Sequence, residues 1–161
     1  MTKKTKTQLG AIFILAVLVL SLILSQTASP DSQLFWGLKR IQEKVYLKLK
    51  SNPNEKLDYM RFLLDRRLQE LKSQVERQSY GYILPSALRY STLAGQITDI
   101  IIVNNMKDQV ASIINQFKDH QKALYEIYVI YPKNTDNLEY KYIEDDINYL
   151  KLYLDKLTKI Q

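Results

Sequence analysis

The chain has 161 residues and a formal charge of +6 at pH 7, from 23 Lys and Arg against 17 Asp and Glu. It contains no cysteine, which excludes a disulfide framework and a lipoprotein anchor, so packing must supply its stability. Only four glycines and four prolines are present. This is little turn chemistry for a many-stranded sheet, and the composition favours an all-α fold with room for one domain.

An uncharged apolar run, Leu9 to Leu24, follows the lysines at positions 3, 4 and 6. As a helix, this run would span about 24 Å at 1.5 Å per residue, close to the length of a membrane-crossing helix. Lysines on the short side predict that this end stays in the cytoplasm and that the rest of the chain lies outside. With its polar flanks, the segment 9–25 predicts a membrane anchor; a secretory signal that is cleaved from the chain is the alternative.

The predicted organisation has four parts: a basic cytoplasmic tip at 1–8, the membrane segment at 9–25, a linker at 26–31 and an extracytoplasmic helical domain at 32–161. The positive charge lies mostly between residues 32 and 80, which hold 11 basic and 6 acidic residues. Nucleic acid is not an expected partner, because the domain lies outside the cytoplasm and carries no motif that reads nucleic acid.

The first predicted helix begins at Asp31 or Ser32, either of which can cap it, and runs to about Lys50. Five residues at helical spacing place one apolar stripe on it: Leu34, Leu38, Ile41, Val45 and Leu49. Trp36 flanks this stripe. It either lies at the lipid interface, which suits its amphipathic ring, or packs against the end of the helical domain.

The second predicted helix has a clear start signal. Asn52 fits the N-cap, Pro53 the first helical position and Glu55 the third, which is the capping-box arrangement with Asn at the cap. The helix is expected to run to about Gln78 with an apolar stripe of Leu57, Met60, Leu64, Leu68, Leu71 and Val75. Because the link is short, the first two helices are expected to form an antiparallel hairpin.

The next stretch contains no proline between Pro85 and Pro132 and predicts two helices. Apolar residues keep helical spacing on both sides of Asn104-Asn105, but the two halves do not share one register. The prediction is therefore one helix over 85–103 and another over 106–130, with a single bent helix as the alternative.

After a loop at 131–137, the last helix is expected to begin at about Leu138. Its apolar seam alternates spacings of four and three residues, at Ile143, Ile147, Leu150, Leu154 and Leu157. Glu144, Asp145 and Asp146 lie in its first half, where the helix dipole favours anions, and are expected to be solvated. The domain is thus expected to be an antiparallel bundle of four or five helices.

Several short motifs resemble one bacterial extracytoplasmic family. They are Pro30-Asp31-Ser32, Phe35-Trp36, Leu38-Lys39-Arg40, Glu43-Lys44-Val45, Pro53-Asn54-Glu55-Lys56 and Arg66-Arg67-Leu68-Gln69-Glu70-Leu71. The family is known as domain of unknown function 5667, and the segment 118–124 (KDHQKAL) resembles one of its later helices. Trp36 stands where the family usually has Tyr, and Asn54 replaces a usual Glu. The resemblance implies an anchored or exported helical domain and carries no established activity.

No catalytic, cofactor-binding or metal-binding motif stands out, so neither enzyme activity nor a cofactor is expected. His120 is the only histidine; it is expected at the edge of the core, because one histidine without a spaced partner makes a weak metal site. The 12 tyrosines either form a binding patch or fill boundary positions of the core. The candidate interaction face joins the basic side of the first hairpin to nearby aromatic residues: Lys39, Arg40, Arg61, Arg66, Arg67, Trp36, Tyr80 and Tyr82.

These features predict a membrane-tethered, extracytoplasmic interaction or scaffold domain of the bacterial envelope, without enzymatic activity. Its expected partners are the cytoplasmic membrane, through 9–25, and an envelope protein or anionic envelope surface. The predicted localisation is the cell membrane with a single pass, or secretion if the signal is cleaved. One alternative function is a chaperone-like or stress-sensing helical binding module. Another is an enzyme acting on envelope polymer, which would need paired carboxylates that no spacing suggests.

Overall fold

The computed structural model describes residues 16–17, 19–21, 23, 33–133 and 137–160, with side chains from Trp36 onward in the first long helix. All regular structure in these residues is helical and no strand occurs among them, which confirms the all-α class. The chain divides into two compact units, Met1–Lys48 and Leu49–Gln161. Each unit is considered by itself.

The predicted membrane segment at 9–25 lies mostly outside the described residues, and the few of its residues that are described are helical. The basic tip at 1–8 and the linker at 26–31 also lie outside them. No helix in the described part of the chain combines the length and the apolar character needed to cross a bilayer.

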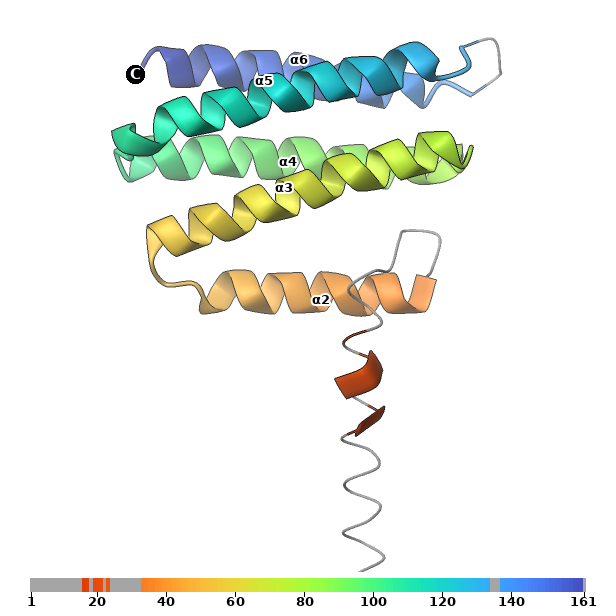
Figure 1. Cartoon of the computed structure of the whole chain (residues 1–161), viewed down its shortest axis with the longest axis horizontal. Helices are drawn as coiled ribbons and strands as arrows, with labels where there is room; N and C mark the ends of the chain where they lie inside the picture. Colours follow the sequence, from red (N-terminus) through yellow and green to blue (C-terminus); the bar gives the residue numbers. More distant parts are fainter. Residues whose placement is uncertain (1–15, 18, 22, 24–32, 134–136, 161) are drawn as a thin grey trace, which may run out of the picture. The chain divides into compact units, whose positions relative to one another are not determined.

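Helix α2, Gln33–Leu49, is the long helix of the first unit (Figure 1). The helix was predicted from Asp31 or Ser32 to about Lys50, and the structure has it from Gln33 to Leu49, so the prediction is correct to within a residue or two at each end. Three members of its apolar stripe are nevertheless exposed: Ile41, Val45 and Leu49 have exposed fractions of 61%, 50% and 70%. Apolar periodicity therefore predicts the helix but does not decide whether its apolar side is buried.

Helix α3, Pro53–Glu76, starts where the sequence predicts. The N–H of Asn54 donates to the side-chain oxygen of Asn52 at 2.9 Å, so Asn52 is the N-cap. Glu55 pairs with Lys50 at 3.3 Å. Of the predicted stripe, Leu57, Met60, Leu64, Leu71 and Val75 are buried and Leu68 is half-buried.

Two helices end in the same backbone motif, with a residue other than glycine in the left-handed region. Gln78 has φ 58° after α3, and Asn105 has φ 51° after α4, Ile83–Val103. In each case the next residue closes a long turn: Ser79 N–H donates to the Gln74 carbonyl at 2.8 Å, and Met106 N–H donates to the Ile101 carbonyl at 3.0 Å. These bonds satisfy carbonyls that the helix end leaves open, as in a Schellman motif.

The Asn105 turn separates α4 from α5, Lys107–Ile130. This confirms the prediction of two helices rather than a single bent one. A short 3₁₀ turn, η1 at Tyr80–Tyr82, connects α3 to α4.

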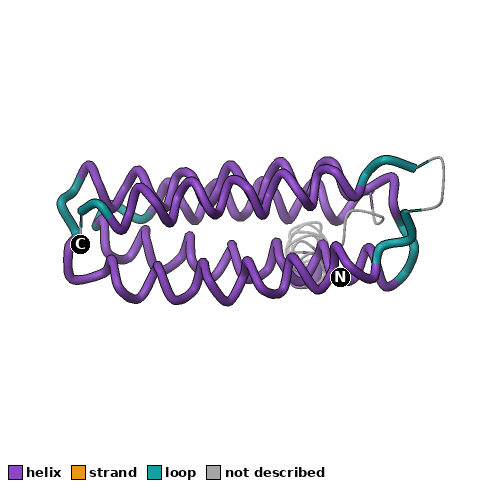
Figure 2. The backbone as a smooth tube through the Cα atoms, turned by 90° about the horizontal axis from the view of Figure 1, so that it is seen from above, coloured by secondary structure: helices purple, strands orange, loops and turns teal. Residues whose placement is uncertain are grey.

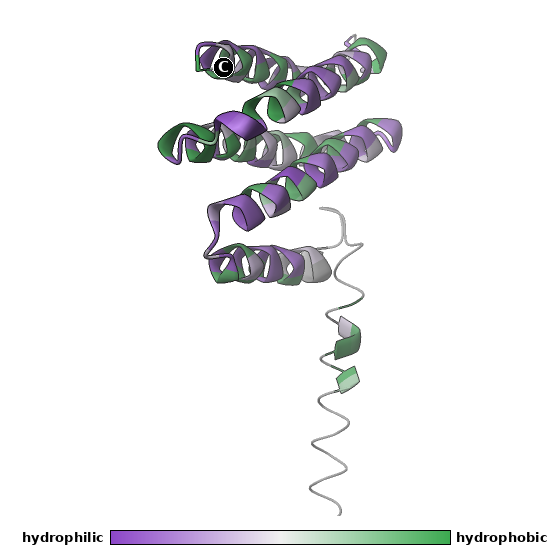
Figure 3. Ribbon diagram, turned by 60° about the vertical axis from the view of Figure 1, so that its left-hand side comes forward, coloured by the Kyte–Doolittle hydropathy of each residue, from purple (hydrophilic) through white to green (hydrophobic). Residues whose placement is uncertain are grey.

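Helices α3 to α6 pack together as a bundle in the second unit. α3 packs along α4 and α5, and α6, Tyr140–Thr158, also packs along α4 and α5. The order around the bundle is therefore α3, α4, α6, α5. Helices that follow one another in the sequence run in opposite directions, so the neighbours α4 and α6 are parallel, as are α3 and α5 (Figures 1 and 2). Figure 3 shows hydrophilic and hydrophobic residues mixed along these helices, as expected when each buries one side.

The apolar seam of α6 lies against the rest of the bundle. Ile143, Leu150 and Leu157 are buried, and Ile147 and Leu154 are half-buried. The helix begins at Tyr140, two residues later than expected, after Asn137 has accepted a hydrogen bond from the Glu139 N–H at 2.9 Å.

Gly95 gives α6 a close approach to α4. A Cβ at this position would lie 2.8 Å from the hydroxyl oxygen of Tyr153, nearer than ordinary contact. The absence of a side chain therefore lets the Tyr153 ring lie against the α4 backbone.

Candidate functional site

His120 connects three helices inside the bundle. Its Nε2 lies 2.8 Å from Oδ1 of Asp65 on α3, and its Nδ1 lies 3.0 Å from the hydroxyl of Tyr90 on α4. The Gln116 side-chain amide donates to the same Asp65 oxygen at 2.7 Å. Tyr90 is completely buried, whereas Asp65 is exposed. The cluster therefore leads from a surface carboxylate into the core.

The environment holds His120 in its neutral form. Burial lowers the pKa of His120, and the hydrogen bond and negative charge of Asp65 oppose this only in part. In the neutral ring, Nε2–H donates to the Asp65 carboxylate and Nδ1 accepts from the Tyr90 hydroxyl, a tautomer that satisfies all three groups. His120 is 6% exposed, so the expectation of a histidine at the edge of the core is wrong.

Asp146 on α6 is a second buried titratable group, with an exposed fraction of 1%. Burial raises its pKa to about 8, although the Ser91 hydroxyl opposes the shift by a hydrogen bond. That hydroxyl also lies 3.0 Å from the Ala87 carbonyl and has one proton to donate. Among the described residues, Oδ2 of Asp146 has no hydrogen-bond partner. The carboxyl group is therefore mostly protonated at neutral pH.

The expectation that Glu144, Asp145 and Asp146 are all solvated is wrong for Asp146 alone. Glu144 and Asp145 are exposed. Asp146 follows Ile143 by three residues and precedes Leu150 by four, so it shares their side of the helix and is carried into the core.

Tyr90 lies within the electrostatic reach of both Asp146 and Asp65, the partner of His120. The pKa of Tyr90 is raised well above the usual value by burial first, and then by the charges of Asp146 and Asp65. We call Asp65, His120, Tyr90, Ser91 and Asp146 the buried polar network. One or more of its members comes from each of the four helices of the bundle.

A different cluster lies at the end of the bundle where α5 meets α6. Neighbouring tyrosine rings there have centroids 4.7 to 6.4 Å apart. The ammonium group of Lys133 lies 3.3 Å from the centroid of the Tyr128 ring, a cation–π contact. We call this cluster the tyrosine end; its aromatic members are Tyr80, Tyr125, Tyr128, Tyr131 and Tyr140.

The tyrosine end combines a fixed interior with an exposed apolar surface. Tyr131 is buried and its hydroxyl donates to Asn137 at 2.7 Å. Burial raises the pKa of Tyr131 to about 12, so the hydroxyl stays protonated. Around it, Tyr125, Val129, Ile130 and Leu138 have exposed fractions of 59%, 57%, 61% and 56%. Aromatic and large apolar side chains of this kind are enriched at protein interfaces.

The sequence-predicted interaction residues on α2 are Trp36, Lys39 and Arg40. The guanidinium carbon of Arg40 lies 4.9 Å from the centroid of the Trp36 ring. Trp36 is half-buried, Arg40 is exposed and Lys39 is 4% exposed.

The predicted arginines of α3 differ in their surroundings. Arg61 donates to Gln116 and Ser112 of α5, each at 2.9 Å, and so joins two helices. Arg67 is buried and forms an ion pair with Glu70. The guanidinium of Arg66 lies 5.5 Å from the Phe62 ring. Arg67 therefore lies in the core and not on the predicted basic face.

The two predicted tyrosines lie in η1. Tyr80 belongs to the tyrosine end, with its ring 4.7 Å from that of Tyr131. Tyr82 is half-buried. The predicted interaction face therefore shares one residue, Tyr80, with the tyrosine end.

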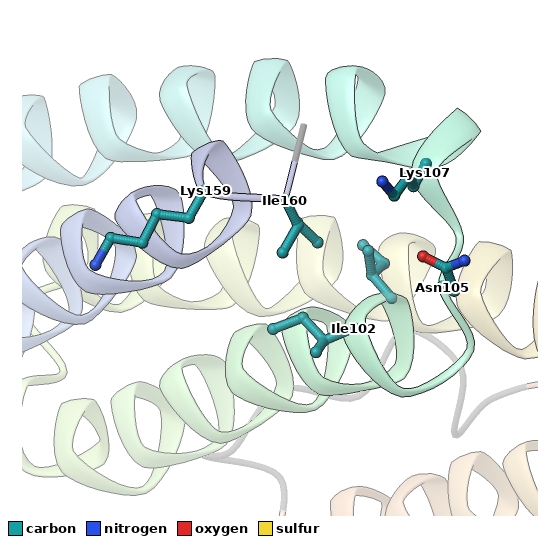
Figure 4. Close-up of a pocket in the computed structure, with 6 residues that line it drawn as sticks. Ile102, Asn105, Lys107, Lys159 and Ile160 are labelled. Atoms are coloured by element: carbon teal, nitrogen blue, oxygen red, sulfur yellow. The ribbon is translucent and has the colours of Figure 1, made fainter.

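The opposite end of the bundle has a shallow pocket of about 370 Å³. It is lined by Ile101, Ile102, Asn105, Lys107, Lys159 and Ile160. Figure 4 shows Lys107 and Lys159 on opposite sides of Ile160. All its polar lining residues are exposed, so no buried polar group would orient a ligand. Elsewhere in the described residues, no group of three or more His, Cys, Asp or Glu could hold a metal ion.

Comparison with protein-family models, with curated proteins and with solved structures gave no match. The resemblance to domain of unknown function 5667 therefore remains a prediction from its motifs. Function must be inferred from the chemistry of this chain's own residues.

Proposed function

We propose that this chain is a membrane-tethered, extracytoplasmic helical domain that binds a partner protein in the bacterial envelope through its tyrosine end. The single observation that carries the proposal is the exposed apolar surface of Tyr125, Val129, Ile130 and Leu138 beside packed tyrosine rings. Catalysis is no part of the proposal.

Covering this surface would remove apolar area from water, which favours binding. Four large side chains at this end of the bundle, each more than half exposed, leave apolar area in water. Tyr131, Asn137 and Lys133 hold the neighbouring tyrosine rings in place, so little conformational entropy is lost when a partner binds. Tyrosine rings also bury a large area while their hydroxyls keep a polar contact.

The tether is supported by the sequence. The run from Leu9 to Leu24 carries no charge and follows three lysines, a pattern that favours insertion with the short end inside. The domain would then face the outside of the cytoplasmic membrane, where an envelope protein is the available partner.

A second candidate function is a stress-sensing helical module, and the buried polar network favours it. Asp146 and His120 have pKa values shifted in opposite directions by burial. A bundle with such a core changes its stability with external pH, which an extracytoplasmic domain experiences directly.

In-cell photo-crosslinking tests the proposed binding site. A photoreactive phenylalanine analogue replaces Tyr125 in the full-length chain, and the same analogue replaces Thr92, which is exposed on the middle of α4. One recurrent protein adduct from position 125 and none from position 92 is expected. A smear of many adducts from both positions would favour the chaperone-like alternative instead.

A matched pair of charge substitutions extends the test. Ile130→Asp places a charge on the tyrosine end, and Leu152→Asp places one on an exposed apolar position of α6. We expect only the first to abolish the adduct. Equal loss in both variants would mean that the surface itself is not the binding site.

A further inference from the structure

The apolar side of α2 is uncovered over three successive turns. Ile41, Val45 and Leu49 follow one another at intervals of four residues and are 61%, 50% and 70% exposed. Residues at this spacing lie on one side of a helix. An exposed apolar strip of this kind marks a contact surface for a partner or a membrane.

Basic residues border this strip. Lys44 follows Ile41 by three residues and Lys48 follows Val45 by three, so each lies beside an apolar neighbour, and both lysines are exposed. Arg40 is exposed as well. In all, α2 contains four basic residues and one acidic residue, Glu43. An apolar strip flanked by cations matches an anionic bilayer surface, which offers hydrocarbon below a layer of phosphate groups.

The position of α2 in the chain favours the same partner. Eight residues separate the uncharged run, which ends at Leu24, from the start of α2 at Gln33. Eight residues reach at most about 29 Å when fully extended. If the run crosses the bilayer, α2 therefore begins within that distance of the outer surface.

We propose that α2 lies along the outer surface of an anionic bilayer, with Ile41, Val45 and Leu49 inserted between the lipid head groups. This inference rests on the tether in the proposed function and adds a second membrane contact to it. A second copy of α2 is a poorer occupant of the strip, because pairing two such helices would bring Lys44 and Lys48 near their own copies. Like charges at this distance repel.

The absence of cysteine allows a direct test on the full-length chain. Val45→Cys carries an environment-sensitive fluorophore on the strip, and Thr92→Cys carries the same fluorophore on an exposed site of α4. Each protein is reconstituted into vesicles of phosphatidylcholine with or without phosphatidylglycerol. At position 45 we expect blue-shifted emission at least twice as strong with the anionic lipid, and quenching by lipid-borne quenchers. At position 92 we expect neither.

A charge reversal tests the role of the lysines. Lys44→Glu with Lys48→Glu should return the label at position 45 to a water-like emission in anionic vesicles. The control is Lys118→Glu with Lys122→Glu, an exposed pair at the same spacing on α5, which should change nothing. An equal effect of both pairs would overturn the specific contact.

Flotation separates failure of this inference from failure of the tether. If the protein floats with the vesicles but the label at position 45 stays in water, the inference is wrong and the tether stands. If it floats and spin labels at position 45 of two copies broaden each other, a second copy covers the strip and the inference is wrong. If it does not float at all, both the tether and the surface contact are wrong.

Discussion

The imidazole of His120 and the carboxylate of Asp65 lie 2.8 Å apart and join α5 to α3 from 55 positions away in the sequence. The carboxylate is exposed to water, whereas the imidazole is buried. The imidazole is a titratable base held in the core beside an exposed carboxylate. The stability of the bundle therefore depends on pH.

The first prediction concerns acidification. Burial lowers the pKa of His120 below its usual 6.5 in the folded protein, so the unfolded chain binds the proton first as the pH falls. The stabilisation is present above pH 6.5 and is lost below it, by up to about 1.4 kcal/mol per pH unit. Asp146 changes the stability in the opposite direction over the same pH range, so the contribution of His120 is the difference in the free energy of unfolding between the wild type and His120→Gln, which should fall as the pH drops below 6.5. Urea unfolding followed by circular dichroism at pH 5, 6 and 7.5 measures this difference.

The control for this prediction is Glu126→Gln, which removes an exposed titratable group from the same helix. It should keep the dependence of the wild type. An unchanged slope in His120→Gln would show that another group is responsible.

The second prediction has the opposite sign. The pKa of Asp146 is about 8 in the folded protein against an ordinary value of 3.8, so folding is favoured by its proton. This contribution is complete below pH 3.8 and is lost as the pH rises to about 8. Asp146→Asn cannot ionise, and its advantage over the wild type should grow by about 1.4 kcal/mol per pH unit in that range.

The difference in the free energy of unfolding between Asp146→Asn and the wild type is measured at pH 5 and pH 7. We expect it to increase by on the order of 2 to 3 kcal/mol. Asp145→Asn, an exposed neighbour, is the control and should show no such increase. A constant difference at both pH values would mean that Asp146 is already ionised in the folded state.

The third prediction concerns backbone strain at Gln78. Its φ of 58° disfavours any residue with a side chain by about 1 kcal/mol relative to glycine. Gln78→Gly should therefore raise the free energy of unfolding by about 1 kcal/mol, whereas Gln78→Ala keeps the strain and should not. Asn105→Gly should gain less, because asparagine tolerates this conformation better. Thermal unfolding of the three variants ranks their stabilities. Equal melting temperatures would contradict the claim that the backbone at Gln78 is strained.

The fourth prediction concerns the start of α3. Asn52→Ala removes the oxygen that accepts from the Asn54 N–H and should cost about 1 kcal/mol. Asn52→Asp keeps an acceptor and should cost little. Asn54→Ala leaves the cap bond intact, since only its backbone takes part, and serves as the control in chemical unfolding. A similar loss in Asn54→Ala would mean that the cap does not carry the effect.

Local signals predicted most of the helices. The Asn52-Pro53 start and the register fault at Asn104-Asn105 act within one or two turns, and both helix boundaries follow from them. The burial of Leu150 and Leu157 also follows from their spacing.

Tertiary placement could not be predicted in the same way. His120 has polar neighbours in sequence, and only the packing of α3 and α4 against α5 shows that it is buried. For Asp146 the sequence did contain a signal of burial, because it falls on the seam between Ile143 and Leu150. The neighbouring acidic residues suggested a solvated segment instead. The exposure of Ile41 and Val45 shows the reverse case, in which an apolar stripe remains uncovered.

Cysteine accessibility tests the membrane tether most directly. Thr92→Cys introduces the only thiol of the chain at an exposed position of α4. Intact cells are treated with a membrane-impermeant maleimide, and membranes are then extracted with alkaline carbonate. A tethered domain outside the membrane should be labelled in intact cells and should stay in the extracted membranes. Labelling only after the cells are broken, or release of the protein by carbonate, would contradict it.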